Sequence, residues 1–288
     1  MNNTNKLGSR ILHHPFIRIV VGIAICVAVF IAVQAAANWL LGFIRLGDEI
    51  KTLITSIITT TAVVTTYIKL YSWYESRAIS ELSTKRLAKN IAIGIVLGAL
   101  LQCLTIYVIY LNHGFFIIST NSFLYVLPGL GISLSAAILE EILFRGIIFR
   151  ITEEKLGSYI ALAISGLIFG LAHLANPNST LVAALGIAVQ AGLLLGAAYI
   201  YTRSLWFPIA LHFAWDFTQS GIFGATMSGG TTAKSLLTTK IGGPDLISGG
   251  SFGPEGSIQA TLFCLAAAIV LMVLNHKQHK LIKPYWAK

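Results

Sequence analysis

The chain has 288 residues, of which 56% are hydrophobic and only 11% are charged, and its mean hydropathy is +0.78. Soluble domains carry about 25% charged residues, so the composition excludes a soluble globular protein and leaves no length for a separate soluble domain. The net charge of +9 raises the question of nucleic-acid binding, but the placement of the basic residues, described below, argues against it.

Apolar segments of near-membrane length recur along the chain. A helix of about 20 residues crosses a hydrocarbon core of roughly 30 Å. The segments therefore predict an all-α fold, a polytopic membrane helical bundle of about eight transmembrane helices that forms one membrane-embedded domain over residues 1–288. The predicted helices cover residues 17–44, 52–71, 90–111, 122–149, 159–175, 181–201, 205–223 and 258–275.

The basic residues divide unevenly between the two sides of such a bundle. If the N-terminus is cytoplasmic, fifteen Lys and Arg residues fall on the inner side and four on the outer side. Short cytoplasmic loops carry an excess of Lys and Arg, so both termini are predicted to be cytoplasmic and the positive charge reflects topology and contact with anionic lipid. The four outer residues are Arg45, Lys51, Lys234 and Lys240.

Two connecting segments stand out from the helices. Residues 72–89 carry closely spaced charges, which favour either an amphipathic helix on the inner membrane surface or a plain solvated connector. Residues 221–257 are rich in Gly, Ser and Thr, and this Gly-rich segment is predicted to be an outer loop or a partly re-entrant cover. A loose connector is slightly favoured there over a lid.

The fourth predicted helix contains two adjacent acids and an arginine, Glu140, Glu141 and Arg145. Residues four apart share a helix face, so Glu141 and Arg145 are expected to pair, whereas Glu140 points about 100° away and lacks that partner. An ionisable side chain inside a membrane span costs several kcal/mol and usually serves a function. A carboxylate without a counter-charge in such a site is suited to act as a general base.

Two histidines on later helices can meet this carboxylate. If the fourth and fifth helices form a hairpin that turns at Gly157, Glu140 and His173 both lie about 25 Å from the turn. On the seventh helix His212 and Asp216 are four residues apart and share a face. An acid beside a histidine can orient the ring, so these residues predict one polar chamber inside the bundle.

The three patterns, EExxxR, FxxxH and HxxxD on successive membrane helices, together resemble the CPBP family of intramembrane endopeptidases, which includes CAAX-processing and bacteriocin-processing enzymes. The resemblance covers residues of about 120–220, expected to be the catalytic core. It implies a multi-pass protein of a bacterial cell membrane, a peptide or lipid-modified protein as substrate, contact with membrane lipid, no nucleic acid, no metal and no cofactor.

The resemblance also implies roles for individual residues. Glu140 would activate a water that His173 helps to hold, and Glu141 and Arg145 would support the site, as would the motif residue Phe169. His212 and Asp216 would form the oxyanion hole. Since an ionised Asp cannot donate a hydrogen bond, either Asp216 is protonated or His212 donates alone while Asp216 orients it; the second is favoured.

Three alternatives remain open at the level of sequence. One Glu and two His could bind zinc as in a membrane peptidase, although the chain lacks HExxH. Buried Glu and His also serve as proton relays in transporters, but there they spread along a path. A bacteriocin-immunity protein that binds peptides without cleaving them is the third alternative.

Overall fold

The computed structural model describes residues 14–287, and almost all of its regular structure is helical. Lys6, Arg10 and Lys288, counted above as inner-side residues, lie outside the described range. The helices are α2 (Pro15–Gly42), α3 (Asp48–Tyr74), α4 (Leu87–Leu111), α5 (Val126–Glu141), α6 (Arg150–Ala172), α7 (Leu181–Ile187), α8 (Leu194–Thr202), α9 (Trp206–Asp216), the single turn α10 (Asp245–Ser248) and α11 (Ile258–Lys277).

Three π-helical segments continue the helices, and two of them join neighbouring helices into longer rods. They are η3 (Ile142–Phe149) between α5 and α6, η5 (Ala188–Leu193) between α7 and α8, and η6 (Phe217–Ile222) after α9. Such segments are rare and occur mostly at functional sites.

The helices match the predicted membrane segments. Within residues 14–287, six helical runs are long and apolar enough to cross a membrane, and one of them, Phe123–Ala175, contains a non-helical residue at Gly157. That run therefore holds the two predicted segments 122–149 and 159–175, and α9 with η6 accounts for 205–223. The predicted all-α polytopic bundle is confirmed.

The turn at Gly157 requires glycine. Its φ of +75° is rarely adopted by other residues, and a Cβ atom there would lie 2.7 Å from the carbonyl oxygen of Ile282. The predicted hairpin between the fourth and fifth segments is thus present, and the backbone after α11 packs against its tip.

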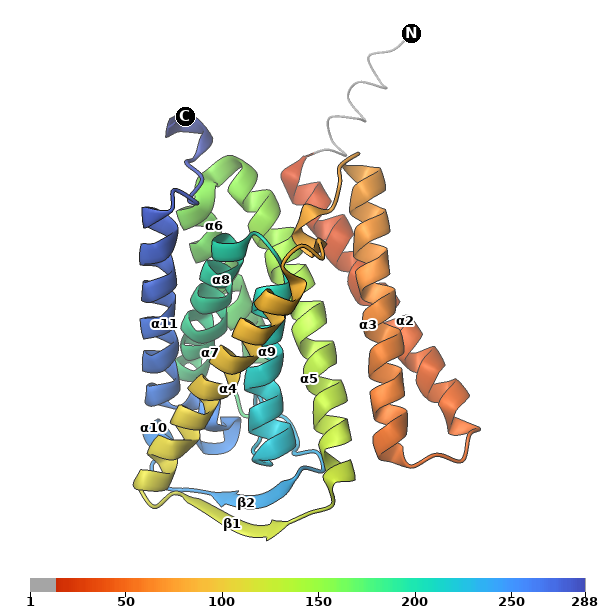
Figure 1. Cartoon of the computed structure of the whole chain (residues 1–288), viewed down its shortest axis with the longest axis vertical. Helices are drawn as coiled ribbons and strands as arrows, with labels where there is room; N and C mark the ends of the chain where they lie inside the picture. The colour runs from red at the N-terminus through yellow and green to blue at the C-terminus, as the bar shows by residue number, and fades with distance from the viewer. Residues whose placement is uncertain (1–13, 288) are drawn as a thin grey trace.

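A β-ribbon closes the opposite end of the bundle and was not predicted. Strand β1 (Phe115–Thr120) pairs antiparallel with β2 (Leu237–Ile241), with Phe115 opposite Ile241. The start of α2 and the end of α11 both lie at the end away from this ribbon (Figure 1). The cytoplasmic location of the termini stays a prediction.

The Gly-rich segment 221–257 is ordered and enters the bundle. It supplies β2, and beyond α10 it buries Phe252 and Glu255, each 3% exposed. The interpretation as a loose connector is therefore wrong, and the partly re-entrant alternative describes the segment better.

Residues 72–89 do not form an amphipathic helix; they are a largely exposed connector of which one part is held by the bundle. Helix α3 continues to Tyr74, and only one 3₁₀ turn, η1 (Ser80–Leu82), precedes α4. Glu81 in that turn is 3% exposed. The first part of the segment is held against the bundle because Glu75, Arg77 and Glu81 find partners there.

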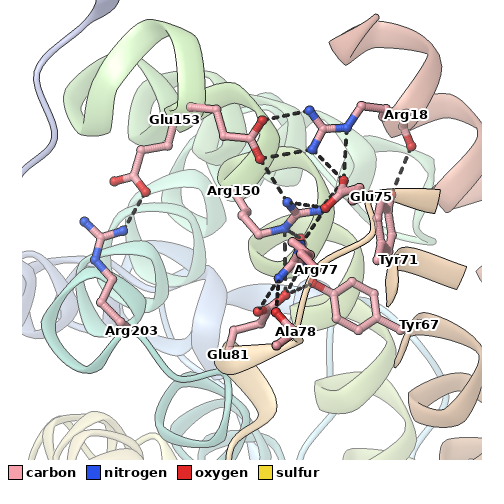
Figure 2. A network of polar contacts seen from close by, with 12 residues as sticks. Arg18, Tyr67, Tyr71, Glu75, Arg77, Ala78, Glu81, Arg150, Glu153 and Arg203 are labelled. Carbon is pink, nitrogen blue, oxygen red and sulfur yellow. Dashed lines mark hydrogen bonds and ion pairs between the residues drawn. The ribbon is translucent and has the colours of Figure 1, made fainter. Parts of the chain in front are cut away.

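These partners make up a buried Arg–Glu network at the end opposite the ribbon (Figure 2). Arg18 of α2 meets Glu75 at 2.5 Å and Glu154 at 2.7 Å, and Arg150 meets Glu75 at 2.9 Å. The tip of the hairpin that turns at Gly157 is thus tied to α2 and to the connection after α3. The network consists of Arg18, Glu75, Arg77, Glu81, Arg150 and Glu154.

Candidate active site

The predicted pair of Glu141 and Arg145 is present and fully buried. Arg145 Nη1 lies 2.7 Å from Glu141 Oε1, and both side chains are 0% exposed. Arg145 Nη2 also donates to the carbonyl oxygens of Ala191 and Gly192. These carbonyls belong to η5, whose altered hydrogen-bond register makes its backbone available to the guanidinium. The pair therefore locks the α5–η3 rod to the α7–α8 rod.

His212 lies at the centre of three carboxylates. Its Nδ1 is 3.1 Å from Glu141 Oε1, whereas its Nε2 is 3.4 Å from Asp216 Oδ2 and 3.9 Å from Glu140 Oε2. The hydrogen-bonded partner that fixes the ring is thus Glu141, and Asp216 faces the other nitrogen. Glu141 is thus a second acid placed to orient the ring, and the orienting role expected of Asp216 stays a prediction.

Glu140 is left without a hydrogen bond, as its helical position predicted. Its Oε2 atom is buried, and in the part of the chain that the structure describes it has no hydrogen-bond partner. The side chain as a whole remains 27% exposed. Glu140 therefore combines a shielded oxygen with access from outside, next to the Nε2 edge of His212.

His173 ends α6 and is oriented by the aromatic residue four positions earlier. Its Nδ1 lies 2.8 Å from the carbonyl oxygen of Phe169, and the two rings stack with centroids 4.7 Å apart. Since a carbonyl only accepts, Nδ1 carries the proton and Nε2 of the neutral ring keeps its lone pair. The Phe169 ring also lies 4.9 Å below the Arg145 guanidinium. Phe169 thus joins the two motifs physically.

A small cavity connects the two histidines. Its volume is about 40 Å³, and its walls include His173, His212, Phe169 and Asp216. A water needs at least about 10–15 Å³ of such space and several polar partners, so the cavity can hold water between the imidazoles. His212 lies next to both Glu140 and Asp216. His173 shares the cavity with His212 and Asp216, whereas Glu140 is not among the residues that line it.

One acidic residue of the site was missed from the sequence. Glu255, in the turn Pro254–Gly256 of the Gly-rich segment, lines the same cavity and is 3% exposed. One of its oxygens accepts the backbone N–H of Ser228, and its own carbonyl accepts the amide of Gln190 at 2.8 Å. Burial, and secondarily the nearby charge of Asp216, raises the pKa of Glu255 to about 8. The sequence feature that could have identified this residue is an acid within the turn Gly253-Pro254-Glu255-Gly256.

The position of His212 depends on close contact between α4 and α9. Gly94 and Gly98 face α9, and a Cβ on Gly98 would lie 2.2 Å from the carbonyl oxygen of Leu211. Small residues spaced four apart allow membrane helices to approach at the backbone. Leu211, the residue before His212, is thereby held against α4, and the His212 side chain is directed toward Glu141 of α5.

Within residues 14–287 no group of three or more His, Cys, Asp or Glu side chains is arranged to hold a metal ion. The acidic side chains instead contact Arg145 and His212. The expectation of a site without metal or cofactor stays a prediction.

Comparisons with known proteins fall on the same segment. Residues 121–218, about a third of the chain, match the family model described as type II CAAX prenyl endopeptidase Rce1-like. The resemblance is confirmed over this segment. All seven residues singled out from the sequence, from Glu140 to Asp216, lie within it.

A curated relative gives a second, shorter match. The putative membrane peptidase YdiL of Bacillus subtilis (strain 168) is 36% identical over 80 residues, which are 28% of this chain and 30% of the relative. The match thus spans less than a third of that relative's length, and it agrees with the family match in pointing to a membrane peptidase.

Proposed function

We propose that the protein is an intramembrane endopeptidase that hydrolyses a peptide bond of a membrane-associated or lipid-modified peptide. The family match over residues 121–218 supports the reaction class. The observation that carries the proposal is the Glu140 carboxylate, whose buried oxygen has no hydrogen bond and lies 3.9 Å from His212. His212 in turn lines a cavity large enough for water.

In this proposal Glu140 acts as general base. It takes a proton from a water molecule, and the water oxygen attacks the carbonyl carbon of the scissile bond. His173 accepts a hydrogen bond from that water through Nε2, since its Nδ1 proton is held by the Phe169 carbonyl. When the C–N bond breaks, Glu140 returns the proton to the leaving amine.

His212 stabilises the tetrahedral intermediate. With Nδ1 held by Glu141 and Nε2 facing Asp216 and Glu140, a protonated ring donates from Nε2 to the oxyanion. A single donor of this kind lowers the activation free energy by about 3–4 kcal/mol. Asp216 lies 3.4 Å from the same ring nitrogen, and Arg145 keeps Glu141 in place.

The substrate class follows from where the site lies. The matched family is described as acting on CAAX prenyl proteins, and a lipid anchor would keep a short peptide at the membrane beside a buried site. We propose a substrate of this kind, presented to a multi-pass protein from within the bilayer.

The test compares the peptides of cells that carry wild type, Glu140→Gln or Glu49→Gln. Glu49 is a matched control because it pairs with Lys234 at an exposed position away from the site. Cleavage products should disappear only in Glu140→Gln. Unchanged products in a Glu140→Gln variant that is inserted and folded would rule the proposal out.

The zinc alternative is tested on the same protein. Wild type purified without chelator is analysed for bound metal, and its cleavage is measured before and after adding a chelator. A zinc peptidase predicts stoichiometric metal and loss of cleavage, whereas the proposed glutamate mechanism predicts neither.

A further inference from the structure

A second, larger cavity lies at the end of the bundle where α11 ends. Its volume is about 650 Å³, within the range of roughly 300–1,000 Å³ that ligand pockets occupy. Four parts of the chain form it: the connection after η1, the start of α4, the turn between α8 and α9, and the backbone after α11. It shares none of its lining residues with the cavity between the histidines.

The lining of this basic cavity is strongly positive. Five basic side chains and no acidic ones line it: Lys85, Arg86, Lys89, Arg203 and Lys280. Arg203 is paired with Glu153 at 2.5 Å, and Lys280 donates to the Tyr201 carbonyl. Lys85, Arg86 and Lys89 have no ion pair with any residue that the structure describes. Three positive charges therefore converge without compensation.

A buried amide also faces this space. Asn90 is 8% exposed and lines the cavity, and its side chain has no hydrogen-bond partner among the described residues. Its amide is therefore available to donate a hydrogen bond to a ligand oxygen in this space. Helix α4 begins here with Arg86 as an N-cap that makes no side-chain cap, and the positive end of its dipole favours an anion.

The cavity opens onto a lipid-facing strip of α4. Ile93 lines it and is 46% exposed. Exposed apolar residues continue from there at helical spacing, on the face away from α9. They are Ile93, Val96, Leu100, Leu104 and Tyr107. A ligand that has an anionic head and an apolar chain fits both parts, whereas a free phosphate ion uses only the first.

We propose that the basic cavity binds the phosphate-bearing headgroup of an anionic phospholipid, with an acyl chain along the exposed strip of α4. Lys85, Arg86 and Lys89 contribute the charge, and Asn90 contributes a hydrogen bond to a headgroup oxygen. Anionic lipids concentrate in the cytoplasmic leaflet, and this is the leaflet at which the predicted topology places the cavity. The proposal does not depend on the peptidase activity.

The test measures lipid binding to the purified full-length protein by native mass spectrometry and by titration in detergent. The probes are dioleoyl phosphatidylglycerol, dioleoyl phosphatidylcholine and inorganic phosphate. Wild type should bind phosphatidylglycerol in preference to phosphatidylcholine. Lys85→Gln/Arg86→Gln/Lys89→Gln should weaken that binding about a hundredfold, since each basic residue near a membrane surface contributes about fivefold.

A control variant removes the same charge from the other end. Arg45→Gln/Lys51→Gln/Lys240→Gln should bind phosphatidylglycerol as wild type does, and an equal loss in it would overturn the proposal as a general charge effect. Asn90→Leu keeps every charge and should weaken binding about fivefold, the effect of one hydrogen bond.

Two further outcomes decide the matter. If inorganic phosphate alone shifts the unfolding temperature of wild type and displaces phosphatidylglycerol, the ligand is a soluble anion and the lipid proposal fails. If the triple variant does not fold, Asn90→Leu is the deciding variant, and binding by it equal to wild type overturns the site.

Discussion

The molecule contains two buried clusters built from the same residue types, and they differ in how their charges are matched. In the Arg–Glu network, Arg18, Arg77 and Arg150 meet Glu75, Glu81 and Glu154 at close distances. In the candidate active site, one arginine and one imidazole face several carboxylates. Buried oxygens of Glu140 and Glu141 are left without hydrogen bonds.

This difference separates a cluster that stabilises the fold from a cluster whose carboxylate can take part in a reaction. A carboxylate that accepts several hydrogen bonds from guanidinium groups is stabilised in its charged form and is a poor base. A carboxylate shielded from water with few donors nearby takes up a proton more readily. The network is therefore expected to govern stability, and the site is expected to govern turnover.

The largest expected effect is on turnover. Glu140→Gln should lower peptide cleavage by about 10²- to 10⁴-fold, the usual contribution of a general base, and leave the unfolding temperature unchanged, since no hydrogen bond is lost. Cleavage and thermal unfolding are measured on the same preparation. A large fall in unfolding temperature would make Glu140 a structural residue and remove the contrast.

The next effect is on stability. Arg150→Met should destabilise the protein by about 3–5 kcal/mol, because it removes a buried guanidinium that donates to Glu75, Glu154 and the Gly146 carbonyl. Thermal unfolding is compared with Lys155→Met, whose side chain is exposed. Below the unfolding transition, cleavage by Arg150→Met should match wild type. A stable but inactive variant would contradict the separation.

The two clusters should also respond oppositely to pH. Burial would raise the pKa of Glu81, but the hydrogen bonds from Arg77 and Tyr67 outweigh it and hold the pKa below its ordinary value. Its stabilisation is present above the unfolded pKa of about 4.3 and is lost as the pH falls below that value. Glu255 has a folded pKa of about 8, so its stability contribution is present at low pH and falls as pH rises from about 4.3 to 8.

Two variants sharpen this comparison. Glu255→Gln should gain stability relative to wild type as the pH rises from about 5 to 8, by an amount on the order of a few kcal/mol. Glu81→Gln should be less stable than wild type at neutral pH, with the difference shrinking below about pH 4. The free energy of unfolding is measured across this pH range in detergent. If its difference from wild type changed with pH in the same way for both variants, the opposite pH responses of Glu81 and Glu255 would be contradicted.

The smallest effect concerns the contact that positions His212. Gly98→Ala places a methyl group against the Leu211 backbone and should cost about 1–3 kcal/mol through overpacking. Because α9 carries His212, the same variant should lower the rate of cleavage more than substrate affinity. Gly42→Ala, at a glycine with free space around it, is the control and should match wild type in both measurements.

Local spacing was enough to predict much of the fold and the central contacts. The helices, the turn at Gly157 and the Glu141–Arg145 pair depend on positions within about one helical turn or on the length of apolar runs. The convergence of His173 and His212 on one cavity follows from helix lengths around two turns.

Contacts between distant segments were not predictable in this way. The β-ribbon pairs residues more than a hundred positions apart, and strand propensity alone does not select a partner. Glu255 enters the site because Gly-rich backbone can fold back into the bundle. Glu81 is buried because Arg77 of the same connection and Arg150 of α6 pair with it. The role of Glu141 toward His212 depends on the angle between α5 and α9.

The hairpin tip at Gly157 has a practical consequence for handling the protein. The Ser158 N–H donates to the Ile282 carbonyl, the Ile282 N–H donates to the Ser158 hydroxyl, and these reciprocal bonds are 2.9 and 2.8 Å long. An affinity tag or fluorescent reporter that replaces the residues after Lys280 would remove both hydrogen bonds and expose the turn between the two helices. Fusions placed beyond Trp286 leave it intact.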